Sequence, residues 1–420
     1  MTDGSVPDAP AAPRPCRCCE APLTHLVVDL GMSPLANRFL TAEQCREMEP
    51  FYPLRLWLCT ACGLVQLEEF ETPERIFTDY AYFSSYSDSW VRHARDYAEM
   101  AIARFGLGAD SRVVEIASND GYLLQHFVAR GIPVLGIEPA ANVAEAARAR
   151  GIPTVVEFFG TTSARRLAAE GVAADLVVAN NVLAHTPALR DFVAGLRHVL
   201  KPGGTVTLEF PHLERLLAEN QFDTIYHEHF SYFSLTTVDR LFRDHGLRVV
   251  DVEELPTHGG SLRVYAQAAE TAGPRSPRVD EVLSREAAGG LSRPERLAAF
   301  GEQVEATKRD LLEFLIAARR AGRRIAGYGA PGKSTTLLNY CGIRTDFLEY
   351  TVDRSPVKQG RFLPGTHIPI HPPEHLARTR PDYVLILPWN LKDEIMESVG
   401  WIRDWGGQFV VPIPEVKVLP

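Results

Sequence analysis

The chain has 420 residues, of which 45% are hydrophobic and 23% are charged, as in ordinary globular proteins. Its formal net charge of -9 argues against a nucleic-acid-binding face, and no apolar run approaches the roughly 20 residues that span a bilayer. We therefore expect neither nucleic acid nor membrane among its partners, and the length predicts two or three domains.

The amino-terminal end lacks the charged and then apolar pattern of a signal peptide. Met1-Thr2-Asp3-Gly4 leads into a Pro/Ala-rich stretch, so we expect a disordered lead over residues 1–13. The expected compartment is the cytoplasm, where clustered cysteines serve more often as metal ligands than as disulfides.

Two C-x-x-C pairs follow, Cys16 with Cys19 and Cys59 with Cys62. This spacing lets both sulfurs of a pair reach one tetrahedral ion, so the two pairs predict a structural Zn²⁺ site with four thiolates and no position open for catalysis. The segment between the pairs is longer than in a compact zinc ribbon, and Cys18 leaves open an assignment in which it replaces Cys16 or Cys19. A redox pair is disfavoured, because neither motif stands at a strand-to-helix junction.

The next segment predicts a nucleoside site. An apolar strand, residues 113–116, contains Glu115 and is followed by a turn with Gly121 and a helical pattern, and a second strand, residues 134–137, ends in Glu138. The turn lets a ligand approach the backbone closely, and a carboxylate at the end of the second strand accepts hydrogen bonds from ribose hydroxyls. An ordinary βα turn is the alternative interpretation.

The same turn indicates which nucleoside binds. Ala117 and Asn119 stand where a dinucleotide fingerprint has glycines, which favours S-adenosylmethionine over NAD. The expected contacts of this cofactor are Glu115, Ala117, Asn119, Gly121, Tyr122, Glu138, Asn180 and Asn181.

Strand and helix patterns alternate over residues 112–267. Residues 175–181 are typical of a buried parallel strand that ends in two asparagines, with His185 just beyond, at the edge where open α/β sheets bind ligands. A helix, the Lys-Pro-Gly-Gly turn of residues 201–204 and another strand follow. This order resembles class I S-adenosylmethionine-dependent methyltransferases, although a generic turn also explains residues 201–204.

Residues 222–233 hold the densest set of titratable groups, two histidines that flank Glu228 among aromatic residues. In one interpretation His227 and His229 bind a single metal ion, which requires a strand. In a second, one histidine is satisfied in the core and the other is exposed. In a third, a histidine of near-neutral pKa acts as a general base that a carboxylate orients, and the position just after a methyltransferase sheet favours this one.

The carboxy-terminal third predicts a second α/β unit. Composition predicts a linker over residues 270–295, and apolar spacing predicts a helix over residues 297–321. A strand and a glycine turn with Lys333 then match both the phosphate-loop and the dinucleotide patterns. The remaining length is short for a phosphate-loop NTPase, and Pro331 removes one N–H donor from the loop. We expect a helix N-terminus that holds a diphosphate, with Asp353 binding a ribose.

These segments predict an α/β protein with four parts. The parts are a disordered lead with a small zinc-binding module, a central Rossmann-like methyltransferase sheet, a linker with a long helix, and a second Rossmann-like nucleotide-binding domain, over residues 1–75, 76–270, 271–320 and 321–420.

Taken in order, the segments resemble the C-methyltransferases of nucleotide-activated deoxysugars over nearly the whole chain. The C-x-x-C pairs are similar to the family's zinc module, residues 115–121 to its S-adenosylmethionine loop, and residues 226–230 to the segment with its catalytic Glu-His pair. Residues 258–263 are similar to a further family signature, and residues 327–334 with 338–342 are similar to its sugar-nucleotide domain.

The resemblance implies methylation at C3 of a dTDP-4-keto-deoxyhexose, for the branched sugars of antibiotics. The C4 ketone makes the C3 hydrogen acidic, so we assign His229 as the base, with Glu228 orienting or charging its imidazole. The candidate donors to the enolate oxygen are His185, Tyr226 and Tyr82.

The implied partner is therefore a dTDP-linked keto-deoxysugar, and we expect a monomer or a weak homodimer. Tyr80 competes with Tyr82 for the place of the family's active-site tyrosine. The expected substrate contacts are Arg263, Tyr328, Lys333, Asn339, Asp353, Lys358 and Trp389.

Other functions stay open at this point. O- or N-methylation would need no carbanion and hence no strong dependence on His229. A phosphate-loop ATPase or kinase would depend on Lys333. A non-catalytic interaction protein would combine the zinc module with a degenerate methyltransferase fold.

Overall fold

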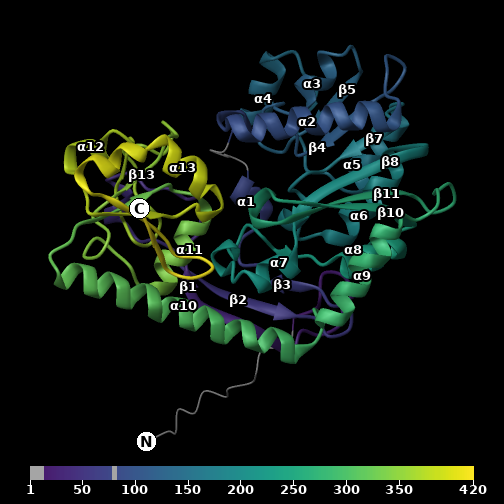
Figure 1. Cartoon of the computed structure of the whole chain (residues 1–420). Helices are drawn as coiled ribbons and strands as arrows, with labels where there is room; N and C mark the ends of the chain where they lie inside the picture. Colours follow the sequence, from purple (N-terminus) through teal and green to yellow (C-terminus); the bar gives the residue numbers. More distant parts are fainter. Residues whose placement is uncertain (1–13, 78–82) are drawn as a thin grey trace, which may run out of the picture.

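The computed structural model describes residues 14–77 and 83–420 of the chain. Their strands form sheets of four, seven and six strands (Figure 1). The candidate tyrosines Tyr80 and Tyr82 lie outside the described residues. None of the helices in these two stretches combines the length and the apolar character of a membrane span.

The first sheet is antiparallel and consists mostly of the amino-terminal module. Leu54, Leu56 and Leu58 are buried and alternate with partly exposed residues, as the twofold period of a half-covered strand requires. Its fourth strand comes from far along the chain. In order across the sheet, the strands are β1 (His25–Ser33), β2 (Tyr52–Leu58), β3 (Val65–Leu67) and β9 (Ser231–Tyr232). The short helix α1 (Pro73–Phe77) follows β3.

The second sheet has five parallel strands and two antiparallel strands at one edge. In order, they are β10 (Leu247–Leu255), β11 (Ser261–Ala268), β8 (Leu200–Pro211), β7 (Ala174–Val178), β4 (Val113–Ile116), β5 (Val134–Ile137) and β6 (Thr154–Val155). The strand order reverses between β4 and β7, and open α/β sheets bind their ligands at such a switch point. The expected Rossmann-like sheet is confirmed.

Helices cover both faces of the second sheet. Val113 packs in one apolar cluster with α2 and α3, whereas the next residue, Val114, packs in another with α5, α6 and α8. Strands covered on both faces are continuous apolar runs, which is why the sequence showed them without alternation. The helices are α2 (Asp88–Phe105), α3 (Leu124–Val128), α4 (Ala141–Ala149), α5 (Thr161–Ala169), α6 (Leu189–Val199), α7 (Leu213–Ala218) and α8 (Leu235–Asp244).

The third sheet forms the carboxy-terminal α/β unit that the sequence predicts. Its strands are parallel except for the last one. In order, they are β14 (Ile370–His371), β13 (Thr351–Val352), β12 (Ile325–Tyr328), β15 (Tyr383–Ile386), β16 (Gln408–Val411) and β17 (Lys417–Leu419). Its helices are α11 (Gly332–Cys341), α12 (His375–Thr379) and α13 (Lys392–Ser398).

The segment expected as a linker, residues 270–295, contains a helix, α9 (Pro277–Gly289). Ser276 caps this helix with its side chain, and Val279 and Val282 are buried in the apolar cluster of the second sheet. Because these two valines are a narrow apolar stripe, the Ala-, Glu- and Arg-rich composition of α9 resembled that of a linker. Tertiary packing decides the outcome.

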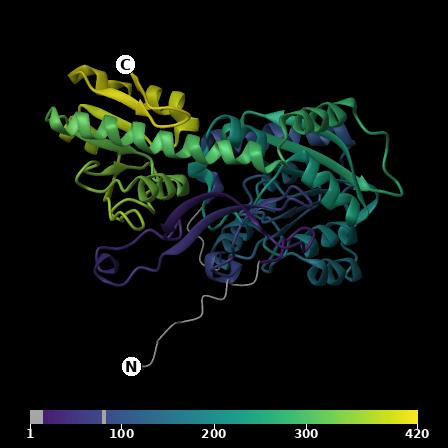
Figure 2. The ribbon, with the colours of Figure 1, turned by 90° about the horizontal axis from the view of Figure 1, so that it is seen from below.

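The long helix α10 (Pro294–Arg320) spans about 40 Å and runs along the first sheet to the third (Figures 1 and 2). Leu297 and Leu315 of this helix share one hydrophobic core with Leu56 of the first sheet and Ile325 of the third. The amino-terminal module and the carboxy-terminal unit are therefore held together by a common core.

Candidate active site

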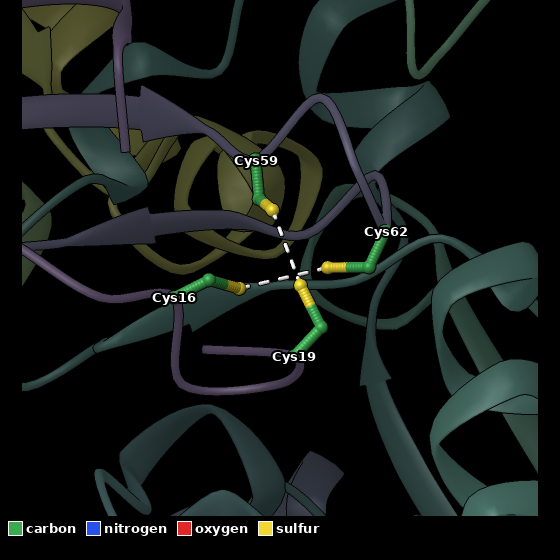
Figure 3. Close-up of side chains that lie close together, drawn as sticks. All are labelled: Cys16, Cys19, Cys59 and Cys62. Carbon is green, nitrogen blue, oxygen red and sulfur yellow. Dashed lines mark hydrogen bonds between the residues drawn. The ribbon is translucent and has the colours of Figure 1, made fainter. Parts of the chain in front are cut away.

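The four cysteines of the two C-x-x-C pairs meet in one cluster (Figure 3). Their sulfurs lie within 4.8 Å of one another, and the Cys16–Cys62 and Cys19–Cys59 Sγ distances are both 3.5 Å. Sulfurs about 2.3 Å from a tetrahedral zinc ion are about 3.8 Å apart, so the geometry fits Zn²⁺. Cys18 does not belong to the cluster; its backbone N–H donates to Cys16 Sγ at 3.4 Å, which settles the assignment that the sequence left open.

Backbone and side-chain donors also support the cluster. Each pair lies in a tight turn, closed by Glu20 N–H on the Cys16 carbonyl and by Gly63 N–H on the Cys59 carbonyl, both at 2.8 Å. Gln66 Nε2 donates to Cys16 Sγ at 3.1 Å. Such donors orient thiolates and stabilise their charge.

The loop after β4 takes the backbone conformation of a glycine-rich loop without its glycines. Ala117 and Asn119 have φ of 52° and 50°, beside 78° at Gly121. A left-handed conformation is strained for alanine. Contacts hold the loop in place, since Asn119 N–H donates to Glu138 Oε2 at 3.0 Å and Asn119 Oδ1 accepts from Ser84 N–H at 2.9 Å.

Several buried polar atoms near this loop have no hydrogen-bond partner among the described residues. They include Glu115 Oε2 at the end of β4, and Asn180 Oδ1 and Asn181 Nδ2 just after β7. Burial, with Glu138 and Asp120 nearby, raises the pKa of Glu115 well above its usual value. Two unsatisfied oxygens and one unsatisfied N–H donor at a switch point fit a ligand with ribose hydroxyls and other polar groups, which S-adenosylmethionine provides.

Aromatic rings connect the cofactor loop with His258 of the predicted signature through Trp90, which the sequence did not single out. The Tyr122 ring lies 6.4 Å from the Trp90 ring, and Trp90 lies 5.0 Å from His258. His258 has φ 55°, another strained value for a residue other than glycine. Trp90 gave no signal in the sequence because a lone aromatic in a helix is ordinarily part of the core.

His229 lies at the centre of the predicted catalytic segment. Its Nδ1 donates to the Thr224 carbonyl at 3.1 Å, so the other nitrogen, Nε2, is an acceptor in the neutral ring and receives the Tyr226 hydroxyl at 2.9 Å. Burial, together with His185, His258 and Lys333 nearby, holds the pKa of His229 well below its usual value. The imidazole is therefore neutral and has its lone pair at Nε2.

Glu228 does not orient His229, contrary to expectation. Its carboxylate accepts hydrogen bonds from the N–H and the Nδ2 of Asn37, at 3.2 and 2.8 Å, and burial raises its pKa to about 7. The turn at residues 227–228 points this side chain toward the amino-terminal module. Thr224 and Tyr226 orient the imidazole instead, and a partner such as Asn37, so distant in the sequence, gives no local signal.

His185 also differs from expectation. Its Nδ1 donates to the Glu228 carbonyl at 2.8 Å, and its ring lies 4.7 Å from that of His229. Burial lowers the pKa of His185 to about 4. The ring is thus neutral with its proton on Nδ1, so its Nε2 is an acceptor and not the donor to an enolate that the sequence suggested.

The metal interpretation of the two histidines is not supported. His227 Nε2 donates to the Pro53 carbonyl at 3.1 Å, and the side chain is 4% exposed. His227 is therefore buried as the second interpretation requires, but His229 is half-buried rather than exposed, and of the two histidines His229 is the candidate base.

Lys333 brings the carboxy-terminal unit to the catalytic segment. Its Nζ donates to Asn390 Oδ1 at 2.7 Å and lies 4.3 Å from the Trp389 ring, whose Nε1 donates to Asp223 Oδ2 at 2.8 Å. Burial lowers the pKa of Lys333, while Asp223 opposes the shift. A side chain at Gly259, where φ is 84°, would meet Trp389 at 2.7 Å, so this glycine permits the close approach.

The phosphate-loop interpretation is not supported, because a phosphate loop needs a serine or threonine hydroxyl that binds magnesium. Ser334 is fully buried and donates to the Pro331 carbonyl at 2.6 Å, so its hydroxyl is not available to a magnesium ion. Asp353 closes the glycine turn, because its carboxylate accepts from Ala330 N–H at 2.7 Å and from Ser355 N–H at 2.8 Å.

Among the other expected substrate contacts, Lys358 and Tyr328 lie at this turn, and Arg263 and Asn339 have structural partners. Lys358 Nζ donates to the Ala330 carbonyl at 2.9 Å, and Tyr328 ends β12 with 4% of its surface exposed. Arg263 donates to two buried or half-buried carboxylates of the second sheet, and Asn339 donates to the Thr335 and Pro364 carbonyls. The positions of Arg263 and Asn339 therefore give no support to a role in substrate binding.

Three family models match successive parts of the chain. They are a zinc binding domain over residues 16–77, a methyltransferase domain over residues 90–252 and a C-methyltransferase C-terminal domain over residues 256–414. C-methyltransferase NovU from Streptomyces niveus is 37% identical over 404 residues, which cover 96% of each chain.

Solved structures with similarity to this chain are more distant. PH0226 protein from Pyrococcus horikoshii OT3 is 17% identical with a TM-score of 0.37, covering 47% of this chain and 99% of that chain. The CcbJ methyltransferase from Streptomyces caelestis is 15% identical with a TM-score of 0.34, covering 42% and 89%.

The match to NovU extends through the zinc cluster, the cofactor loop and the carboxy-terminal unit alike, so all of them are parts of one enzyme type. The chain belongs to the family of S-adenosylmethionine-dependent C-methyltransferases with a zinc-binding domain at the amino terminus.

Proposed function

We propose that the enzyme methylates C3 of a dTDP-4-keto-deoxyhexose in the biosynthesis of a branched antibiotic sugar. The carrying observation is a neutral imidazole, His229, whose ring lies 4.7 Å from that of His185, which follows β7 at the carboxyl edge of the second sheet. A carbon becomes nucleophilic only after it loses a proton, and a ketone at C4 allows this at C3. The cofactor supplies the methyl group, and the protein removes the C3 proton and aligns the carbon.

The hydrogen bonds of His229 support its role as the base. Nε2 accepts the C3 proton, and the Thr224 carbonyl stabilises the imidazolium through Nδ1. For Nε2 to take this proton, the Tyr226 hydroxyl must give up its hydrogen bond to Nε2, and it then donates to the enolate oxygen instead. Burial and His185 hold the pKa of His229 low and Lys333 adds to this effect, so a diphosphate that neutralises Lys333 would make the imidazole a stronger base.

Isotope exchange tests this proposal directly. The enzyme without methyl donor is incubated with a dTDP-4-keto-6-deoxyhexose in D₂O, and deuterium at C3 is followed by NMR. We expect label at C3 that depends on the enzyme and on His229. A sugar that is methylated without any enzyme-dependent exchange at C3, with or without S-adenosylhomocysteine, would contradict the enolate.

Glu138 is proposed to accept the ribose hydroxyls of the cofactor while it holds the loop at Asn119. In Glu138→Gln, one carboxylate oxygen becomes an N–H donor and the charge is lost, so we expect the Kd of S-adenosylhomocysteine to rise about 10-fold or more. Calorimetric titration measures this value. Glu145→Gln, on the exposed side of α4, is the matched control and should bind normally. Equal affinity of both variants would rule out the contact.

Lys333 is proposed to bind the substrate diphosphate. We expect Lys333→Ala to raise the KM of the sugar nucleotide about 10- to 100-fold, because a hydrogen bond to a charged group is lost, and to leave the Kd of the donor unchanged. Steady-state kinetics measures both, with the exposed Lys392→Ala as control. ATP hydrolysis that disappears in Lys333→Ala would instead favour the phosphate-loop enzyme.

A further inference from the structure

The catalytic segment is built into the sheet of the zinc module. Directly after residues 226–230, β9 pairs with β3, Gln66 opposite Ser231 and Val65 opposite Tyr232. Leu67 N–H donates to the Phe230 carbonyl at 3.0 Å. The loop that carries His229 thus continues into a strand whose position depends on the amino-terminal module.

Arg17 joins the metal cluster to this segment. It lies between Cys16 and Cys18, and its N–H donates at 3.0 Å to the side chain of Gln66, which in turn donates to Cys16 Sγ. The Arg17 guanidinium donates to the Phe230 carbonyl at 3.1 Å and lies 5.3 Å from the Phe230 ring. A continuous set of bonds runs from a zinc thiolate to the residue after His229.

Two further contacts hold the rest of the segment. Asn37 binds the Glu228 carboxylate through two hydrogen bonds, and the Pro53 carbonyl accepts from His227. The N–H of Asn37 and the carbonyl of Pro53 are backbone groups of the amino-terminal module. Residues 227, 228 and 230 are therefore each bound by a different part of it.

We propose that the zinc module is the scaffold of the active-site loop, with Arg17, Gln66 and Asn37 as positioning residues for His229. This inference rests on the proposed role of His229. A general base acts only from within hydrogen-bond reach of its proton, so small displacements of the loop reduce turnover without weakening cofactor binding. None of the three residues touches the reacting atoms; each holds the backbone of the segment in place, Asn37 by binding the Glu228 side chain next to His229.

Hydrogen–deuterium exchange of the zinc-loaded enzyme tests the proposal without any sugar. In Arg17→Met, we expect one zinc per chain and a normal Kd for S-adenosylhomocysteine, but about 10-fold faster amide exchange in residues 226–232 and about 10-fold lower kcat. The matched control is Arg14→Met, because Arg14 binds the Glu69 carbonyl and Glu68 rather than the loop; it should exchange as the parent does.

The proposal would be overturned if a folded Arg17→Met variant showed unchanged amide exchange at residues 226–232, or if this variant lost its zinc. If that variant does not fold, Asn37→Ala decides, since Asn37 lies away from the cysteines: exchange equal to the parent contradicts the proposal, and faster exchange confined to residues 226–232 supports it. These measurements of amide exchange and zinc content do not depend on the identity of the substrate. Failure of C3 labelling with faster loop exchange would remove only the proposed function.

Discussion

In His229→Asn, kcat is expected to fall about 1,000-fold, because a positioned general base contributes roughly 100- to 10,000-fold and asparagine accepts no proton. The variant should still bind S-adenosylhomocysteine, since His229 lies in the loop after the second sheet's parallel strands and not at their ends. Single-turnover kinetics with the sugar nucleotide measures the chemical step. C3 labelling in D₂O should be lost together with turnover.

The exposed His198→Asn is the matched control and should retain full activity. A loss of less than about 10-fold in His229→Asn would contradict base catalysis and favour O- or N-methylation, which needs no carbanion.

The pH profile gives a second readout of the same base. Because the pKa of His229 lies well below its usual value, the imidazole stays neutral as the pH falls through 6.5, and its contribution to kcat/KM should persist there. Burial raises the pKa of Glu228 to about 7. A decline of kcat/KM near pH 7 that disappears in Glu228→Gln would therefore report the titration of Glu228.

Of all the changes considered, we expect loss of the metal to lower the free energy of unfolding most. Elemental analysis should find one zinc per chain, and none when all four cluster cysteines are replaced by serine. Structural zinc binding contributes about 10 kcal/mol or more to small metal-dependent modules. The first sheet shares its core with the third, so the midpoint of thermal unfolding should fall strongly, as calorimetry would measure.

Three single variants test which thiols bind the metal. Cys18→Ser should keep its zinc, because Cys18 lies outside the cluster, and Cys45→Ser should do so as well. Retention of full zinc after Cys16→Ser, combined with loss after Cys18→Ser, would show that the ligand assignment is wrong.

Local patterns were sufficient to predict the zinc cluster, a central Rossmann-like sheet and the carboxy-terminal unit. The C-x-x-C spacing, the apolar runs of 113–116 and 175–178 and the glycine turn before α11 each specify a local geometry. Residues close in sequence determine such geometry, so one chain is enough to recognise it. The conformation of Ala117 was beyond this reasoning, because the strain is compensated by contacts from Glu138 and from residues before α2.

The sequence by itself determined which chemical groups the enzyme has: four thiolates, an acidic strand end, a histidine among aromatics and a lysine after a glycine turn. Only the tertiary structure decided their partners. In the folded chain Glu228 bonds to Asn37, His229 bonds to Thr224 and Tyr226, and Ser334 bonds to Pro331. The segment expected as a linker contains the helix α9. Hydrogen-bond partners depend on which distant segments share a core, and the local apolar pattern shows that a segment is buried but not which segment it packs against.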